Sequence, residues 1–289
     1  MRKNLLLITV VFFIGTAMKS DKPAYQFFDL KGKNAEYKDV VKKALESDIV
    51  FFGELHNSPI CHWLELEMAK DLYEEKKEGL VMGAEMFETD NQLLVDEYLS
   101  GRIKEKNFEA EVKLWDNYKT DYKPLLVFAK KNNIPVIATN VPRRYASLVN
   151  KSGFEGLDSL SNEAKMFLPP LPVAYDPELK GYKDMIEMMG GLGGHVTPNI
   201  PKAQAIKDAT MAHFILQNVK KGQVFIHYNG TYHSDNFEGI VWYIRQAQPD
   251  LKILTISSVE QDDMTGLSEE NSGLADFTLC VPSSMCKTY

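Results

Sequence analysis

One stretch decides the fold of this chain: residues 51–62, FFGELHNSPICH. It begins in a short apolar run and passes through a glycine into polar, ionisable side chains. Residues 63–72, which follow, have the apolar spacing of a helix. The layout predicts a strand, a polar turn and a helix, and in an open parallel sheet such a turn lies where ligands bind. Glu54, His56 and His62 make this turn a candidate for acid–base or metal-binding chemistry.

Apolar runs of strand length recur along the chain, and helical patterns separate them. We expect strands, several with a polar exit, within residues 48–52, 79–88, 133–145, 222–233, 251–258 and 277–281. We expect helices at residues 36–46 and over most of residues 90–130, and a polar lead-in at residues 20–35. Strands that alternate with helices predict an α/β fold with a mainly parallel sheet and flanking helices.

The N-terminal residues have the layout of a secretory signal. Residues 1–4 (MRKN) are basic, residues 5–15 are almost wholly apolar, and residues 16–20 (TAMKS) are small or polar. The apolar run is too short for a comfortable membrane span. We therefore expect a signal peptide over residues 1–19, export of the protein, and a single α/β domain over residues 20–289.

The overall charge of the chain limits its partners. The 289 residues carry a formal net charge of -7 at pH 7. Proteins that bind nucleic acids usually present basic surfaces, because they must neutralise phosphates. We therefore expect no nucleic acid among the partners of this protein.

Residues 151–205 interrupt the alternation of strands and helices. They contain a proline-rich segment at 168–172, several tyrosines and methionines, and the glycine-rich run GGLGGH at 190–195. No strand pattern is visible there. We interpret this segment as a helical insertion, a lid over the carboxyl edge of the sheet, with a flexible joint at the glycines.

Four of the expected strands end in residues that can carry chemistry. They contribute, in chain order, Glu54 with His56, Glu85, Asn140 with Arg143, and His233. In a parallel sheet these ends converge on one crevice. Two histidines and two glutamates in one crevice could bind a divalent metal or carry out acid–base catalysis. The alternative is that the two glutamates only cap helices or bond to the backbone near turns.

The remaining histidines and the first cysteine allow more than one interpretation. His62 either faces the crevice or packs, and His195 either binds a ligand or faces solvent. His213 and His227 lie in apolar patterns, which predicts core positions. Cys61 is expected to be a small buried side chain rather than a nucleophile.

Several motifs, taken in order, resemble one family. They are Gly53-Glu54-Leu55-His56 with His62, Gly83-Ala84-Glu85-Met86-Phe87, the helix start Tyr122-Lys123-Pro124, residues 137–143 (IATNVPR), residues 203–212 (AQAIKDATMA) and Asn229-Gly230-Thr231-Tyr232-His233. Together they resemble the ChaN family of iron-regulated haem-binding lipoproteins, in the haem-binding-uptake and Tiki-like superfamily. The resemblance runs from about residue 45 to residue 260.

The resemblance implies an exported protein that binds haem b and takes part in iron uptake at the periplasm or outer membrane. It also implies ferric haem ligated by a tyrosine and held at a homodimer interface, with an outer-membrane haem receptor as a further partner. The chain departs from the lipoprotein pattern because no cysteine for a lipid anchor stands at residues 15–20.

A tyrosinate ligand needs partners that favour the anion, and haem propionates need cationic or imidazole partners. Among the tyrosines we favour Tyr182 as the iron ligand, then Tyr145, then Tyr175. The candidates for contacts to haem, and to its propionates in particular, are His195, Lys180, Lys183 and Arg143.

The main hypothesis is therefore a haem carrier rather than an enzyme. Its rival is a metal-dependent hydrolase, a peptidase or esterase, that uses Glu54, His56, Glu85 and His233. In such an enzyme a bound metal would lower the pKa of a water molecule and make it the nucleophile. A third alternative is an α/β protein whose crevice is inactive and which only scaffolds partners.

Overall fold

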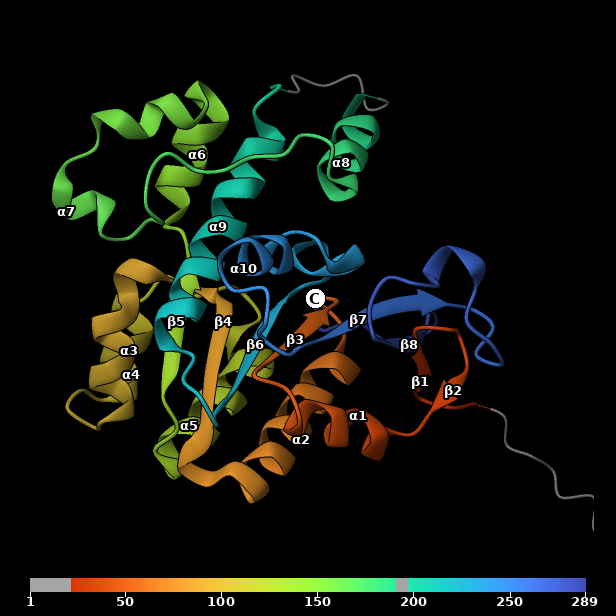
Figure 1. Cartoon of the computed structure of the whole chain (residues 1–289). Helices are drawn as coiled ribbons and strands as arrows, with labels where there is room; N and C mark the ends of the chain where they lie inside the picture. The colour runs from red at the N-terminus through yellow and green to blue at the C-terminus, as the bar shows by residue number, and fades with distance from the viewer. Residues whose placement is uncertain (1–21, 191–196) are drawn as a thin grey trace, which may run out of the picture.

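A computed structural model describes residues 22–190 and 197–289, and its centre is one sheet (Figure 1). The expected signal peptide and His195 lie outside the described residues. The sheet has eight strands in the order β2-β1-β8-β7-β3-β6-β4-β5. Their bounds are β1 Gln26–Asp29, β2 Asn34–Ala35, β3 Ile49–Glu54, β4 Leu80–Glu88, β5 Val136–Asn140, β6 Val224–Gly230, β7 Ile253–Gln261 and β8 Phe277–Pro282.

The sheet is mixed but mainly parallel, as the sequence predicts. Neighbouring strands from β8 through β7, β3, β6 and β4 to β5 run parallel. All six residues of β3 are buried, which is typical of a central strand covered on both faces. At one edge β1 runs antiparallel to β8, and β2 to β1. The polar lead-in predicted for residues 20–35 is therefore wrong, because Phe27 and Phe28 are buried within β1.

Helices cover both faces of the sheet and its carboxyl edge (Figure 1). The α-helices are α1 Tyr37–Leu45, α2 Pro59–Lys76, α3 Gln92–Leu99, α4 Glu105–Glu111, α5 Lys123–Asn132, α6 Arg143–Ser152, α7 Asn162–Lys165, α8 Lys180–Gly190, α9 Ile200–Asn218 and α10 Ile240–Ala247. The first five share one apolar cluster with the sheet, and α9 and α10 share another. A third cluster joins α6 to the segment after it and to Ile206 of α9.

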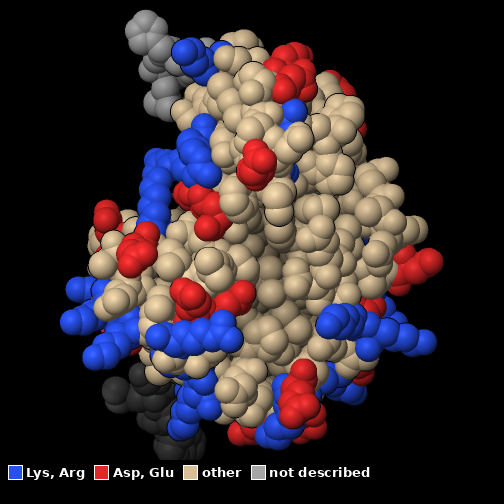
Figure 2. Space-filling model, turned by 90° about the vertical axis from the view of Figure 1, so that its left-hand side faces the viewer, with Lys and Arg blue, Asp and Glu red and all other residues tan. Residues whose placement is uncertain are grey.

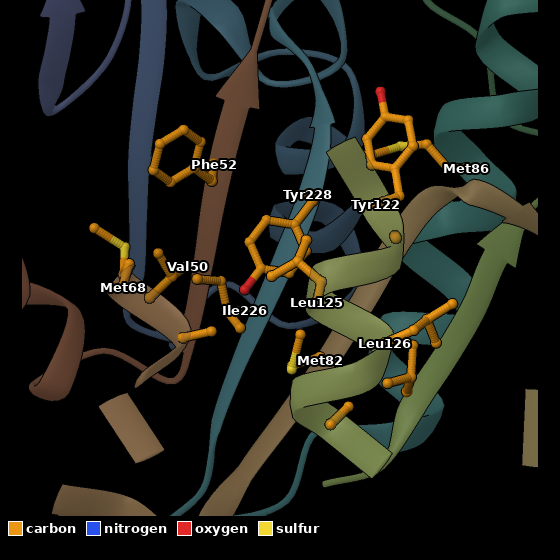
Figure 3. Packing of buried hydrophobic residues seen from close by; sticks show 14 of the residues in the cluster. Val50, Phe52, Met68, Met82, Met86, Tyr122, Leu125, Leu126, Ile226 and Tyr228 are labelled. Atoms are coloured by element: carbon orange, nitrogen blue, oxygen red, sulfur yellow. The ribbon is translucent and has the colours of Figure 1, made fainter. Parts of the chain in front are cut away.

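The largest apolar cluster fixes the strands against α2 and α5. Figure 3 shows Phe52 and Tyr228 from neighbouring strands, packed near Met68 of α2 and Leu125 of α5. Such burial, at about 25 cal/mol per Å² of apolar surface, is the main favourable term in folding. The packing holds the carboxyl ends of β3, β4 and β6 at fixed positions.

The helix after β3 begins at Pro59, four residues before the apolar spacing from which the sequence predicts it. The Ser58 side chain accepts a bond from the backbone N–H of Cys61 at 3.5 Å, and Pro59 occupies the first turn. Both residues favour a helix start, since Ser satisfies an unpaired N–H and Pro has none to satisfy. The turn between Glu54 and Ser58 is therefore short, and it leaves His56 at the strand end.

The surface carries charges of both signs. Figure 2 shows Lys and Arg interspersed with Asp and Glu on one face, with no region of a single sign dominating it. Within residues 22–190 and 197–289, no helix is long and apolar enough to cross a membrane.

Candidate functional site

The carboxyl ends of three strands bring the four predicted crevice residues together. Glu54 ends β3, and its Oε1 lies 2.7 Å from Nδ1 of His56. Glu85 of β4 accepts a bond from the Gly230 N–H at 2.8 Å and lies 3.2 Å from Nε2 of His233. The predicted convergence of Glu54, His56, Glu85 and His233 is therefore present in the structure.

Gly230, at the end of β6, allows His56 to approach the other pair. A Cβ atom at this position would lie 2.7 Å from His56 Nε2 and 3.6 Å from Glu85 Oε2. The first separation is too short for any side chain. His56 therefore packs directly on the β6 backbone beside Glu85, and a side chain at residue 230 would displace it.

A second carboxylate from α9 completes the surroundings of His233. Asp208 contacts Nδ1 of His233 in a short hydrogen bond, and its other oxygen accepts a bond from the Tyr182 hydroxyl at 2.8 Å. Gln204, one turn earlier on α9, lies 3.1 Å from Nε2 of His233. His233 is thus held between two buried carboxylates, Glu85 and Asp208.

The charges of this group follow from its burial and its partners. Burial alone would lower the pKa of His233, but Glu85 and Asp208 outweigh it and raise the pKa to about 9. Burial would raise the pKa of Glu85, but His233, His56 and Lys207 hold it far below its usual range. For Asp208 burial prevails over His233, and its pKa is raised. At neutral pH His233 is therefore an imidazolium beside an ionised Glu85.

In the Glu54–His56 pair both pKa values are raised. Burial, followed by the nearby charge of Glu65, raises the pKa of Glu54 to about 8. Burial would lower the pKa of His56, but its bond to Glu54 and the charges of Glu54 and Glu85 raise it. Tyr122 donates a further hydrogen bond to Glu54 Oε1 at 2.6 Å. The Glu54–His56 pair is therefore built to share a proton at near-neutral pH.

A pocket with two lobes opens over these residues. The larger lobe has a volume of about 1030 Å³ and the smaller about 500 Å³. Both are lined by His56, Glu85, Met185, Gln204 and Lys207. Ligand pockets commonly span about 300–1,000 Å³, so each lobe can hold a small molecule.

The lobes differ in the side chains that they add. Arg143, Trp115 and Tyr289 line the larger lobe. The backbone next to Tyr289 is held by a hydrogen bond from the Thr288 N–H to the Asn57 carbonyl oxygen, at 3.0 Å. Tyr232, which is 53% exposed, lines the smaller lobe. The pocket thus combines cations with aromatic surface.

The three tyrosines favoured from the sequence lie outside the lining of both lobes. Tyr182 is buried, bonded to Asp208 and stacked on Tyr175 with ring centroids 5.6 Å apart. Burial and then Asp208 raise the pKa of Tyr182 far above its usual value. Tyr145 is buried in the cluster around α6, with the Arg144 guanidinium 4.5 Å from its ring. Tyr182 reaches the crevice residue His233 only through Asp208, and the role of these tyrosines as iron ligands stays a prediction.

The predicted propionate partners are also dispersed. Lys180 pairs with Asp184 and Lys183 with Glu178 on the exposed side of α8. Arg143 alone among the described candidates lines the larger lobe. Their contact with haem remains a prediction as well.

Among the residues that the structure places at the site, sequence reasoning missed Asp208, Lys207 and Tyr232. Asp208 and Lys207 lie in α9, where the sequence pattern around His213 predicts an apolar helix face. Both residues belong to the motif at residues 203–212 that resembles the ChaN family. Tyr232 stands in a strand exit that we had already singled out through His233. The rule that strand ends converge could have found Tyr232, whereas no periodicity assigns Asp208 to His233.

The other histidines can now be placed. His62 is buried, with Nδ1 3.2 Å from Glu65 Oε2, and it lines neither lobe. The core prediction is confirmed for His227, which is buried in β6, as is the burial of Cys61. The prediction is wrong for His213, which is half-buried and contacts Gln217 at 2.9 Å, because its side of α9 is not fully covered.

Known proteins resemble this chain in sequence and in structure. A family model described as "Haem-binding uptake, Tiki superfamily, ChaN" matches residues 40–244. The structure of ChaN of Campylobacter jejuni with cofacially bound haem has a TM-score of 0.63 and 16% sequence identity, and the match covers 88% of this chain and 96% of that one. At this identity the likeness shows the fold alone.

Two further proteins also match this chain. Protein RETICULATA-RELATED 5, chloroplastic, of Arabidopsis thaliana is 25% identical over 197 residues, which are 64% of this chain. This chain spans about a quarter of the plant protein, since the match covers 26% of it. An erythromycin esterase in its open conformation has a TM-score of 0.46 and 9% identity, over 82% of this chain and 77% of that one.

Proposed function

Because the chain belongs to the haem-binding uptake, Tiki superfamily, ChaN family, we propose that it is an exported haem-binding protein of iron uptake. The observation that carries the proposal is the two-lobed pocket at the carboxyl ends of β3, β4 and β6. Its larger lobe has a volume of about 1030 Å³, which is at the upper end of the usual range for ligand pockets and suits a ligand as large as haem.

The lining of the pocket suits the chemistry of haem b. The macrocycle needs apolar and aromatic surface, which Trp115, Val141 and Ile200 offer. The two propionates need cationic donors, and Arg143 and Lys207 supply them in the same lobe. Haem itself would supply a ferric iron that takes an axial oxygen or nitrogen ligand.

For the axial ligand we propose Tyr232 rather than Tyr182. Tyr232 lines the smaller lobe together with His56, Glu85 and Lys207, which line both lobes, and it is 53% exposed, so a ligand in the pocket can reach it. The hydroxyl of Tyr182 instead contacts the Asp208 carboxylate, which opposes loss of the phenolic proton. Tyr145 and Tyr175, which also lie outside the pocket lining, serve as comparisons.

Titration of the purified protein with ferric haem tests the proposal. We expect a Soret band and a charge-transfer band typical of ferric tyrosinate. Lys207→Ala should weaken binding about tenfold, by the loss of a charge-assisted bond. Lys202→Ala, on the same helix but outside the pocket lining, should change little.

The tyrosine variants decide the ligand. Tyr232→Phe should remove the charge-transfer band while Tyr182→Phe leaves it, and the reverse result would overturn the choice. A protein that stays free of haem at micromolar concentrations would refute the haem proposal itself.

Export, iron uptake and dimerisation belong to the same proposal. The C. jejuni protein binds haem cofacially, and we propose that a homodimer of this chain encloses haem in the same way. Light scattering with and without haem tests this, and a monomer in both states contradicts it. Fractionation of cells that express the full chain tests export, and the N-terminal sequence of the exported protein should show cleavage near residue 19. We also propose that the protein delivers haem to an outer-membrane receptor.

A hydrolase is a second candidate, because two imidazole–carboxylate pairs face one pocket. Glu54 orients His56, and Asp208 orients His233, which is cationic at neutral pH. Such a site could activate water at His56 and stabilise a developing anion at His233. A panel of ester and peptide substrates tests it. Turnover that His56→Gln abolishes would favour the hydrolase, and no turnover would exclude it for those substrates.

A further inference from the structure

Glu54 belongs to a second cluster, which neither proposed function uses. Glu54, His62 and Glu65 each supply one possible ligand atom, and these atoms lie within 4.8 Å of one another. His62 Nδ1 is 3.2 Å from Glu65 Oε2 and 3.7 Å from Glu54 Oε2. All three side chains are buried. His62 and Glu65 come from the first two turns of α2, which faces the end of β3.

Two carboxylate oxygens of this cluster have no hydrogen-bond partner. They are Oε2 of Glu54 and Oε1 of Glu65. A buried carboxylate oxygen without a partner is costly, and such atoms usually mark a bound ion or proton. The two carboxyl groups also contact each other, so the cluster can hold either a shared proton or a cation.

The distances fit a small cation. Ligand atoms bonded at about 2.0–2.2 Å in a tetrahedron lie about 3.3 Å from one another. The two separations from His62 Nδ1, 3.2 and 3.7 Å, bracket that value. We propose that Glu54, His62 and Glu65 bind a divalent transition-metal cation such as Zn²⁺, with a fourth position for water or a solute oxygen.

The surroundings of His62 orient it for this role. Its Nε2 lies 3.0 Å from the carbonyl oxygen of His56 and 3.5 Å from Asp121 Oδ2. Asn117 donates to both of these acceptors, at 2.9 Å and 2.7 Å. A histidine that binds metal through one nitrogen usually donates the other N–H to a carbonyl or carboxylate. Nε2 therefore faces two acceptors, while Nδ1 faces the two carboxylates of the cluster.

Glu54 connects the cluster to the pocket. Its Oε1 accepts bonds from His56 and Tyr122, and its Oε2 faces His62. Glu54 also lines the smaller lobe, so the cluster lies directly behind the wall of the pocket. The cation would therefore lie behind the pocket, separate from the Glu85–His233 pair.

Metal analysis of the haem-free protein tests the proposal. We expect about one Zn²⁺ per chain after dialysis, and d–d absorption bands when Co²⁺ is added. Glu65→Gln and His62→Gln should each weaken Zn²⁺ binding by at least about tenfold. Glu67→Gln is the matched control, because Glu67 lies on the same helix and pairs with Lys70 at 2.7 Å. Melting temperatures with and without Zn²⁺ show whether each variant is folded.

Three results would overturn the proposal. The first is a wild-type protein that binds neither ion, since the cluster then holds a shared proton only. The second is equal loss of binding in Glu65→Gln and the control. The third is binding that survives Glu65→Gln but is lost in Glu85→Gln, which would place the metal in the pocket instead. None of these results depends on haem, so failure of this proposal is separable from failure of the haem proposal.

Discussion

The charge of His233 should make the protein less stable as the pH rises from about 6 to about 9.5. The pKa of this imidazole is 6.5 when unperturbed and about 9 in the fold, between Glu85 and Asp208. In that interval the folded state binds more protons than the unfolded state, so the free energy of unfolding falls with pH. The stabilisation is complete below the unfolded value and is lost as the pH passes about 9.

The magnitude follows from the two pKa values. The difference between 6.5 and about 9, at about 1.4 kcal/mol per pKa unit, corresponds to roughly 3 kcal/mol. Glu54 and Glu65 have raised pKa values of about 8 and about 7, and they add a loss of the same sign. The contribution of His233 is therefore the difference between the wild type and a variant, not the total loss.

Urea unfolding at about pH 6, 7.5 and 9.5 measures that difference. His233→Gln should lower stability at pH 6 and flatten the pH dependence by roughly 3 kcal/mol. His213→Gln is the matched control, because His213 is half-buried on α9 and away from carboxylate partners among the described contacts. If His233→Gln proves too unstable, the imidazole resonances of the wild type report the same titration. A His233 ring that titrates below pH 7 would refute the reasoning.

Two further variants test other parts of the structure. Gly230→Ala should displace His56, because the new Cβ would lie 2.7 Å from its Nε2. We expect the free energy of unfolding to fall by roughly 1–3 kcal/mol and the His56 imidazole resonance to shift. An unchanged resonance would contradict the packing of His56 on Gly230. Met68→Ala should lower the free energy of unfolding, measured by chemical denaturation, by about 2–5 kcal/mol, since Met68 is fully buried. Leu93→Ala is the control and should lower it by less than about 0.5 kcal/mol, because the Leu93 side chain is 67% exposed. Equal losses would show that Met68 is not a core residue.

The central strands could be predicted because each is a continuous apolar run with a polar exit. β3 is buried at all six positions, and its sequence IVFFGE shows this directly. β1 could not be predicted, since it has only four residues and its partner β8 lies about 250 residues away in the chain. Pairing over such a distance leaves no local pattern, and Phe27 and Phe28 read equally well as loop aromatics.

The same distinction separates the predicted site residues from the missed ones. Glu54 and Glu85 lie in the last part of their strands and His233 follows β6, and parallel strands must bring their ends together. Asp208 lies in the middle of α9, so its contact with His233 depends on how that helix crosses the sheet. The tyrosines are the hardest residues to assign from the sequence. Nothing in the sequence around Tyr182 indicates that its hydroxyl is buried and bonded to the Asp208 carboxylate.

One side chain of residues 51–62, that of Glu54, therefore belongs to both the pocket and the buried cluster. Glu54 directs Oε1 to His56 in the pocket and Oε2 to the cluster with His62 and Glu65. A cation at Oε2 would draw charge from the carboxylate and weaken its hold on the His56 proton, so His56 would become a weaker base. A proton on Glu54 would act in the same direction. The state of the buried cluster thus sets the charge that a ligand meets in the pocket, whether that ligand is haem or a hydrolysable substrate.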